Sequence, residues 1–130
     1  MIDHTGVTVS DFAKSKAFYL RALAPIGYTV LLELPASVTG RGDVAGFGVA
    51  PKADFWIAGG KPNVPPIHIA FRVASRALVD AFYAAAVAAG GRDNGGPGVR
   101  PHYHANYYGA FVLDPDGHNI EAVCHAAENA

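Results

Sequence analysis

Apolar and polar side chains alternate near the N-terminus in a way that predicts a half-buried strand over residues 4–10. A helix follows, capped by Ser10 or Asp11 and running to about Leu23, with its apolar positions on one stripe. Three further strands are expected at residues 28–34, 47–50 and 54–58. The glycine- and proline-rich run 59–66 then interrupts all regular structure, as a linker does.

The same pattern starts again after this linker. A shift of 64 residues gives eight identities within 24 positions, among them His4 on His68 and Gly27 on Gly91. The chain therefore reads as one domain, residues 1–130, built from two β-α-β-β-β units: module 1 at 1–58 and module 2 at 67–125, with the strand signal weakest at 91–104. Units of this size bury their own faces poorly when alone, so we expect an α+β fold in which they share one sheet system.

The most informative stretch is the hairpin over residues 107–124. Its turn is Asp-Pro-Asp-Gly, in which Gly117 tolerates the positive φ that closes the turn. Glu121 then falls in the middle of the last strand and faces away from Ile120, Ala122 and Cys124. A carboxylate in that place is costly unless a partner compensates for it.

Two histidines are candidates for that partnership. His4 and His68 occupy equivalent positions at the start of the first strand of each unit, on the face opposite the apolar positions that pack against the helix. Together with Glu121 they form a two-histidine, one-carboxylate set, which suits Fe(II), Mn(II), Zn or Ni and leaves coordination positions open. The alternative interpretation is that each histidine is an ordinary surface residue.

Composition narrows the class of protein. The net charge of −1 argues against a nucleic-acid partner, and no apolar run reaches bilayer length, so we expect neither nucleic-acid nor membrane binding and a cytoplasmic location. The single cysteine, Cys124, excludes an intrachain disulfide and is expected to be an inert buried thiol.

The repeat, the two strand-start histidines and the run Asp-Pro-Asp-Gly-His-Asn-Ile-Glu resemble the vicinal oxygen chelate superfamily over essentially the whole chain. This superfamily includes glyoxalase I, bleomycin-resistance proteins, extradiol dioxygenases, fosfomycin-resistance transferases and methylmalonyl-CoA epimerase. The resemblance implies paired βαβββ modules in a curved, partly closed mixed sheet with helices outside, and one divalent metal ion held by His4, His68 and Glu121. It also implies lyase, isomerase or dioxygenase-like chemistry on a small substrate with two adjacent oxygens.

The sequence departs from named members of the superfamily at three positions. The fourth-strand carboxylate or amide ligand of glyoxalase I and the epimerase is replaced by Trp56, or by Ile57 in a different register. Extradiol dioxygenases and fosfomycin transferases have a tyrosine ten residues before the glutamate, where this chain has Phe111. Fosfomycin transferases also have a hydroxyl residue two positions after the first histidine, where this chain has Gly6. No named activity therefore transfers directly.

Other candidates for the pocket follow from position along the strands. Tyr107 shares the parity of Glu121 and is a candidate catalytic acid, and His104 is a candidate general acid or base. The candidate substrate-binding residues are Trp56, Arg72, His102 and Phe111. For each of them packing or plain solvent exposure is the competing interpretation.

Two further functions compete with the metal-dependent enzyme. The first is a bleomycin-resistance-type protein that sequesters a small molecule without metal, and the second is a module that has lost its activity. The resemblance also implies a homodimer, with the modules paired either within one chain or between two. In the second arrangement His4 comes from one subunit, and His68 and Glu121 come from the other.

Overall fold

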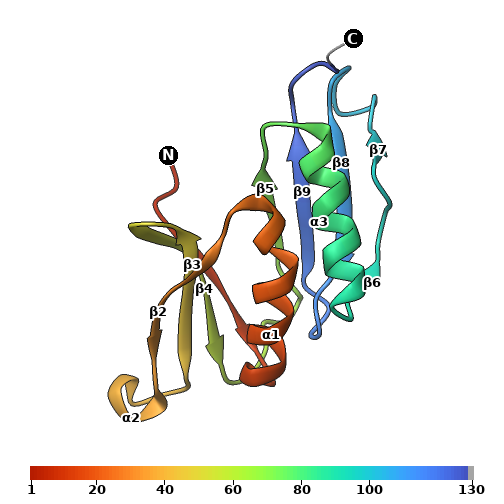
Figure 1. Cartoon of the computed structure of the whole chain (residues 1–130). Coiled ribbons are helices and arrows are strands. Elements are labelled where there is room, and N and C mark those ends of the chain that lie inside the picture. The colour runs from red at the N-terminus through yellow and green to blue at the C-terminus, as the bar shows by residue number, and fades with distance from the viewer. Residues whose placement is uncertain (129–130) are drawn as a thin grey trace.

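A computed structural model describes residues 1–128 of the chain and consists of two sheets, each with helices against one face (Figure 1). The first half contains β1 (Thr5–Val9), α1 (Phe12–Ala22), the short 3-10 helix η1 (Ala24–Ile26), β2 (Thr29–Leu34), α2 (Ala36–Thr39), β3 (Val44–Val49) and β4 (Lys52–Gly59). Its strands lie in the order β1-β4-β3-β2, with β1 and β4 parallel and the other pairs antiparallel.

The second half repeats this plan, except that two short strands take the place of the single strand β2. It contains β5 (His68–Arg72), α3 (Arg76–Ala88), β6 (Arg92–Asp93), β7 (Gly98–Val99), β8 (Tyr108–Leu113) and β9 (Asn119–Cys124). The sheet order is β5-β9-β8-β6, β7 also pairs with β8, and β5 and β9 are parallel. The weak strand signal at 91–104 thus corresponds to two short strands, β6 and β7, which both pair with β8.

The predicted α+β fold of two βαβββ units is confirmed. Where the sequence predicted one shared, partly closed sheet, each unit has a mixed sheet of its own, and the two sheets are not closed into a barrel. Element boundaries differ in places from the sequence prediction. β3 begins at Val44 rather than at 47, and no pattern in the chain indicated α2, a single turn between β2 and β3. Within the described residues, no helix is long and apolar enough to cross a membrane.

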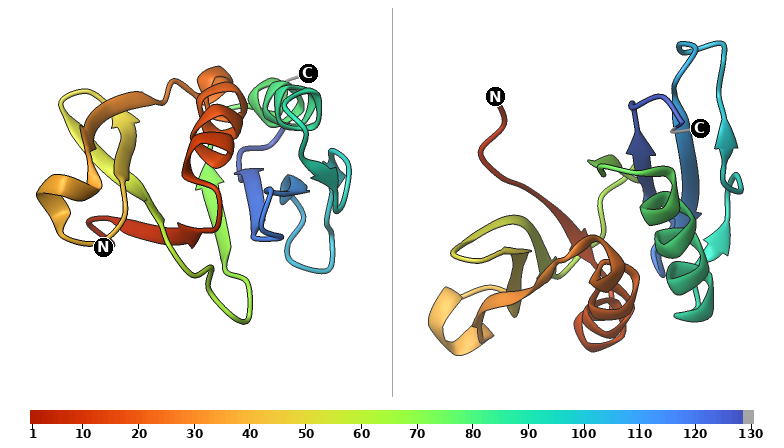
Figure 2. Two further views of the ribbon diagram at one scale, coloured as in Figure 1. Left: turned by 90° about the horizontal axis from the view of Figure 1, so that it is seen from below. Right: turned by 45° about the horizontal axis from the view of Figure 1, so that its top comes forward.

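Both long helices begin at capping residues: α1 at Asp11, one of its two predicted caps, and α3 at Ser75. The side chain of Asp11 accepts a hydrogen bond from the backbone amide of Lys14 (3.1 Å), and that of Ser75 accepts one from Leu78 (3.3 Å). Such bonds satisfy amides that the first turn of a helix leaves without a partner, and each contributes about 1 kcal/mol. The helices then pack side by side, with both on the same side of the molecule (Figure 2).

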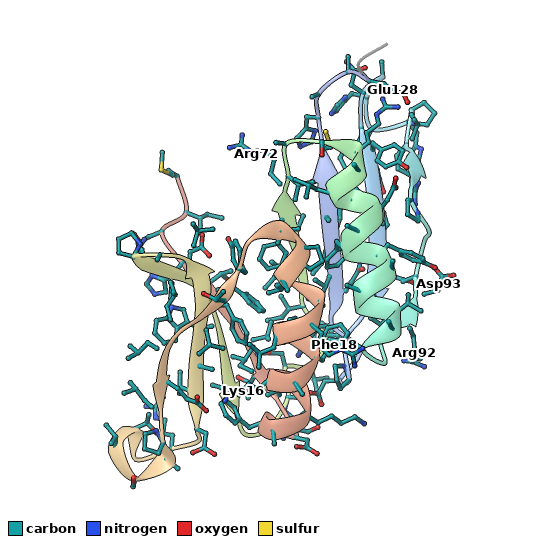
Figure 3. All side chains as sticks on the ribbon, viewed as in Figure 1. Lys16, Phe18, Arg72, Arg92, Asp93 and Glu128 are labelled. Atoms are coloured by element: carbon teal, nitrogen blue, oxygen red, sulfur yellow. The ribbon has the colours of Figure 1, made fainter. Side chains whose placement is uncertain are left out.

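The contact between the two halves depends on close packing near the end of α3. Phe18 lies between α1 and α3 (Figure 3). A Cβ atom built on Gly91 would stand only 2.8 Å from Cε1 of Phe18 and 2.4 Å from Cγ1 of Val112. A side chain at position 91 would therefore separate the helices from the second sheet.

The turn of the β8–β9 hairpin is bonded to the first half. Tyr19 donates its hydroxyl hydrogen to buried Asp114 (2.5 Å), and buried His118 accepts from the Ile67 amide (2.9 Å) and bonds the Thr8 carbonyl (3.0 Å). His118 must therefore carry its proton on Nε2. Gly117 closes the turn with φ of +88°, as predicted for that position. These bonds hold the second sheet in place against the first unit.

Candidate metal and substrate site

Glu121 is the centre of the candidate site. It lies in the middle of β9, its neighbours Ile120 and Ala122 are fully buried on the helix side, and it is itself only 1% exposed. Its Oε1 atom is 2.9 Å from Nε2 of His68, and its Oε2 atom accepts a hydrogen bond from the Tyr107 hydroxyl. A neighbouring imidazole and a hydroxyl donor thus compensate the buried carboxylate that the sequence predicted.

Adjacent strands bring these three groups together. Glu121 pairs in register with Ala70 of β5 on one side and with Phe111 of β8 on the other, and His68 stands two residues before Ala70 on the same face. Gly109 makes room, because a Cβ atom there would lie 3.2 Å from both Oε2 of Glu121 and Cε1 of Tyr107. Burial of the carboxylate therefore depends on a glycine in the neighbouring strand.

Tyr107 is held in a cluster of rings. The ring centroids of Tyr103, His104 and His125 lie 4.7, 5.5 and 5.4 Å from its own. Burial, and then the hydrogen bond and charge of Glu121, raise the pKa of Tyr107 well above its usual range. Its hydroxyl group is thus a stable hydrogen-bond donor to the carboxylate.

His104 is bonded to its own loop and to His125. Its Nδ1 atom accepts a hydrogen bond from the Asn106 amide (3.1 Å), so the proton is on Nε2, which donates to Nδ1 of His125 (2.8 Å). Both imidazoles are exposed. His102 is also exposed, and its ring centroid is 4.2 Å from that of Tyr103. Of the predicted loop histidines, His104 therefore contacts the ring of Tyr107 and His102 contacts that of Tyr103, and neither of them bonds Glu121.

His4 lies elsewhere. It precedes β1, its side chain is 59% exposed, and its Nδ1 atom is 2.7 Å from a carboxylate oxygen of Asp3. Across residues 1–128, no three histidine, cysteine, aspartate or glutamate side chains gather closely enough to hold a metal ion. The structure thus brings together two of the three predicted ligands, His68 and Glu121, and leaves His4 apart from them within one chain.

The geometry of the His68–Glu121 pair can be compared with that of a metal site. Two ligand atoms about 2.1 Å from one ion and at a right angle to each other stand about 3.0 Å apart. The separation of Nε2 and Oε1 is 2.9 Å, which is the length of an ordinary hydrogen bond and also fits one edge of a coordination shell. The other oxygen of Glu121 is engaged by Tyr107, so Oε1 is the oxygen of this carboxylate that could hold a metal ion.

A cavity of about 400 Å³ runs along β5 between the two halves of the chain. His68 and Arg72 line it from β5, and Thr5 and Tyr28 line it from the first half. Arg72 is exposed and points away from the second sheet (Figure 3). A small molecule in this cavity would contact both the exposed imidazole of His68 and a cationic side chain.

Phe111 and Trp56 lie on different sheets. Phe111 is half-buried, its ring centroid is 6.1 Å from that of His68, and the guanidinium of Arg100 lies 5.4 Å above it. Trp56 is half-buried in β4, between the core residues Phe55 and Ile57. By strand parity, its side chain therefore projects from the face opposite α1.

Two residues of this region, Arg100 and His125, were not predicted from the sequence. His125 follows the last strand and has the same odd-numbered parity as Glu121, a signal that could have placed it on the same face. Arg100 lies in the loop after β7, where no periodic pattern existed to predict its stacking on Phe111.

Comparison with solved structures identifies the fold. A glyoxalase/bleomycin resistance protein from Albidiferax ferrireducens is 25% identical, with a TM-score of 0.75 over 95% of this chain and 98% of that one. The fosfomycin resistance protein FosX from Listeria monocytogenes, in complex with Mn(II) and 1S,2S-dihydroxypropylphosphonic acid, is 18% identical, with a TM-score of 0.67 over 95% and 88% of the chains. No curated protein matches the sequence.

The resemblance also extends to a chain about twice as long. Glyoxalase I from Zea mays is 22% identical, with a TM-score of 0.69, and the match covers 94% of this chain but 46% of that one. The sequence itself matches the profile of the Glyoxalase/Bleomycin resistance protein/Dioxygenase superfamily over residues 1–122. With the repeated βαβββ architecture, this match shows that the chain belongs to that superfamily.

Proposed function

We propose that this protein is a metal-dependent enzyme acting on a small substrate with two adjacent oxygens. The observation that carries the proposal is the pairing of a buried carboxylate, Glu121, with the half-exposed imidazole of His68 at 2.9 Å. Burying a carboxylate costs free energy even when polar partners surround it. An apolar residue at this strand position would avoid that cost if the position had only a structural role. A functional site explains why the carboxylate is there.

We propose that His4 of a second copy of the chain completes the ligand set. His4 and His68 are both exposed at the starts of β1 and β5, which are edge strands of their sheets. A homodimer that pairs the first unit of one copy with the second unit of the other would bring these edges together. This arrangement would explain why His68 and Glu121 meet within one chain while His4 of the same chain lies apart from them.

A divalent ion in this site would supply Lewis-acid stabilisation to the two substrate oxygens. The protein groups have separate tasks. Tyr107 keeps its proton and holds Oε2 of Glu121, so Oε1 stays directed at His68. Arg72, at the side of the cavity, attracts an anionic substrate, and His104 and His125 hold the ring of Tyr107.

The first test is the metal content of tag-free protein purified without chelator, measured by elemental mass spectrometry. We expect near-stoichiometric Fe, Mn, Zn or Ni in the wild type and none in Glu121→Ala. Glu33→Ala is the matched control, because Glu33 is an exposed carboxylate bonded to Lys16 and should leave the metal content unchanged. Wild-type protein that stays metal-free after reconstitution would contradict the proposal.

The second test asks where His4 acts. His4→Ala and Glu121→Ala chains, carrying different purification tags, are co-expressed and the mixed dimer is isolated. If the site forms between copies, one of the two sites in the mixed dimer keeps all three ligands and binds one ion. If the site forms within a chain, both sites lack a ligand and the mixed dimer binds none.

A second candidate function is sequestration of a small molecule without metal. The observation favouring it is that, within the described part of one chain, only His68 and Glu121 of the three predicted ligands come together, while aromatic rings surround them. The metal measurement separates the two functions, because a sequestering protein shows no metal in either the wild type or Glu121→Ala.

A further inference from the structure

The cavity beside β5 contains a carboxylate that the candidate metal site does not use. Asp54 of β4 lines this cavity, and its Oδ2 atom accepts a hydrogen bond from the Tyr28 hydroxyl (3.0 Å). Its other oxygen, Oδ1, is buried, and no group within residues 1–128 donates a hydrogen bond to it. A buried acceptor without a donor destabilises a fold, so its presence in a native protein calls for an explanation.

An irregularity in β4 turns Asp54 towards the cavity. In the pairing of β3 with β4, Phe47 faces Phe55 and Gly48 faces Ala53, so Asp54 has no partner across the sheet. Such an extra residue is a β-bulge, which redirects side chains and is common next to functional sites. Strict alternation would place Asp54 and Phe55 on opposite faces of the sheet, yet both line the same cavity.

The wall around Asp54 is aromatic. Tyr28, Phe55 and Phe71 all line the cavity, and the ring centroid of Phe71 lies 5.4 Å from that of Tyr28 and 5.3 Å from that of Phe55. The faces of aromatic rings attract cations, and proteins bind organic ammonium groups in this way. A carboxylate bordered by aromatic rings is therefore suited to a cationic ligand with an apolar body.

The other charged groups of the cavity are already paired or lie in water. Asp3 also lines the cavity, but its exposed carboxylate ion-pairs with Lys52 and contacts His4. Arg72 faces the cavity from β5, in the other half of the chain, and is exposed to water, which screens its charge. Asp54 is thus the carboxylate of this cavity that a donor on a ligand can complete.

We propose that this cavity binds a small primary amine, whose ammonium group donates to the free oxygen of Asp54 while its apolar body covers the rings of Tyr28 and Phe71. The terminal torsion of an aspartate side chain is soft, so a small turn of the carboxylate directs the buried Oδ1 atom to the ligand. Burial and the hydrogen bond to Asp54 raise the pKa of Tyr28 well above its usual range, so its hydroxyl remains a donor to Oδ2. This inference does not rest on the proposed function, since the amine site needs no metal ion.

Three ring compounds of similar size test the charge preference. Benzylamine is cationic at neutral pH, benzyl alcohol is neutral and benzoate is anionic. In NMR titrations of the tag-free protein, we expect benzylamine to bind about tenfold more tightly than benzyl alcohol, because a hydrogen bond between charged groups is stronger than one from a neutral hydroxyl. Benzoate should bind most weakly, and the methyl resonances of Ile26 and Ile69, which line the cavity, should shift with benzylamine. Equal binding of benzylamine and benzyl alcohol, tightest binding of benzoate, or shifts only outside the cavity would overturn the proposal.

Variants assign the preference to Asp54. Asp54→Asn keeps the shape of the side chain and an acceptor for Tyr28 but removes the charge, so the affinity for benzylamine should fall about tenfold, to that for benzyl alcohol. Asp80→Asn is the matched control, because Asp80 also accepts from a tyrosine hydroxyl, that of Tyr108 (2.7 Å), but is exposed on α3 outside the cavity. A preference that survives in Asp54→Asn, or falls equally in Asp80→Asn, would refute the assignment. The comparison of the three compounds in the wild type decides the proposal if Asp54→Asn does not fold.

Glu121→Ala separates this site from the metal site. Glu121 lies on β9 and does not line the cavity, so Glu121→Ala should lose the metal ion and keep the preference for benzylamine. Loss of that preference would show that the amine binds at the metal and would overturn the inference. Wild-type protein without metal that still prefers benzylamine would count against the proposed function alone.

Discussion

The hydroxyl of Tyr107 should stabilise the protein because it compensates the buried charge of Glu121. Tyr107→Phe removes one oxygen atom and leaves the ring in its cluster with Tyr103, His104 and His125. Oε2 of Glu121 then loses its hydrogen-bond donor, while Glu121 remains 1% exposed and out of reach of bulk water. His68 still contacts only Oε1.

The expected loss can be worked out from the hydrogen bond. A hydrogen bond to a charged group contributes about 1.5–3 kcal/mol, against about 0.5–1.5 kcal/mol for a neutral pair. Tyr107→Phe should therefore lower the free energy of unfolding of the metal-free protein by about 2 kcal/mol. In a Glu121→Gln background the partner is a neutral amide, and the same change should cost about 1 kcal/mol. The coupling between the two residues is then about 1 kcal/mol.

Urea unfolding of the four proteins at one pH measures this cycle. Tyr103→Phe is the matched control, because Tyr103 lies in the same loop and is 57% exposed, so its change should stay within about 0.5 kcal/mol. An equal loss for Tyr107→Phe in both backgrounds would refute the reasoning, since it would assign the effect to ring packing instead of to the charge of Glu121.

Two further predictions concern stability. Burial raises the pKa of Tyr19, Tyr28 and Tyr107 above the ordinary value of 10.0, so above that pH the native state keeps protons that the unfolded chain has lost. The contribution of these tyrosines to the free energy of unfolding should be constant below pH 10 and should fall as the pH rises further. Urea titrations that show no such fall would contradict the raised pKa values. His118→Ala leaves the Ile67 amide and the Thr8 carbonyl without partners and opens a cavity, so it should cost about 2–5 kcal/mol in the same assay. The exposed His125→Ala serves as its control, and comparable losses in the two variants would show that the bonds of His118 contribute little.

Local pattern accounts for a large part of the fold. The caps Asp11 and Ser75 and the turn at Gly117 act through residues next to them in the chain, so each can be placed from its immediate neighbours alone. The 64-residue repeat indicates two equivalent units, and strand parity places Glu121 opposite Ile120 and its neighbours. Local pattern does not predict the strands at 91–104, because β6 and β7 form by pairing with β8 and have no alternating pattern of their own.

The partners of Glu121 are only partly predictable from the sequence. His68 is predicted because its position repeats that of His4, and it lies 2.9 Å from the carboxylate. Parity alone makes Tyr107 a candidate acid, whereas the bond from its hydroxyl group to Glu121 is visible only in the folded chain. The separation of His4 from this pair within one chain depends on how the two sheets are placed, which no single segment encodes.

By itself, then, the sequence determined which residues each strand turns away from the helices: His68 and Glu121 in one unit, and Trp56 in the other. The physical reason is that strand parity and helix capping depend on a few consecutive residues. Only the tertiary structure decided which of these side chains meet, since that follows from the register between strands distant in the chain. Register set Gly46 beneath the indole of Trp56 and Gly109 beside the carboxylate of Glu121, and a Cβ atom on either glycine would crowd the side chain next to it.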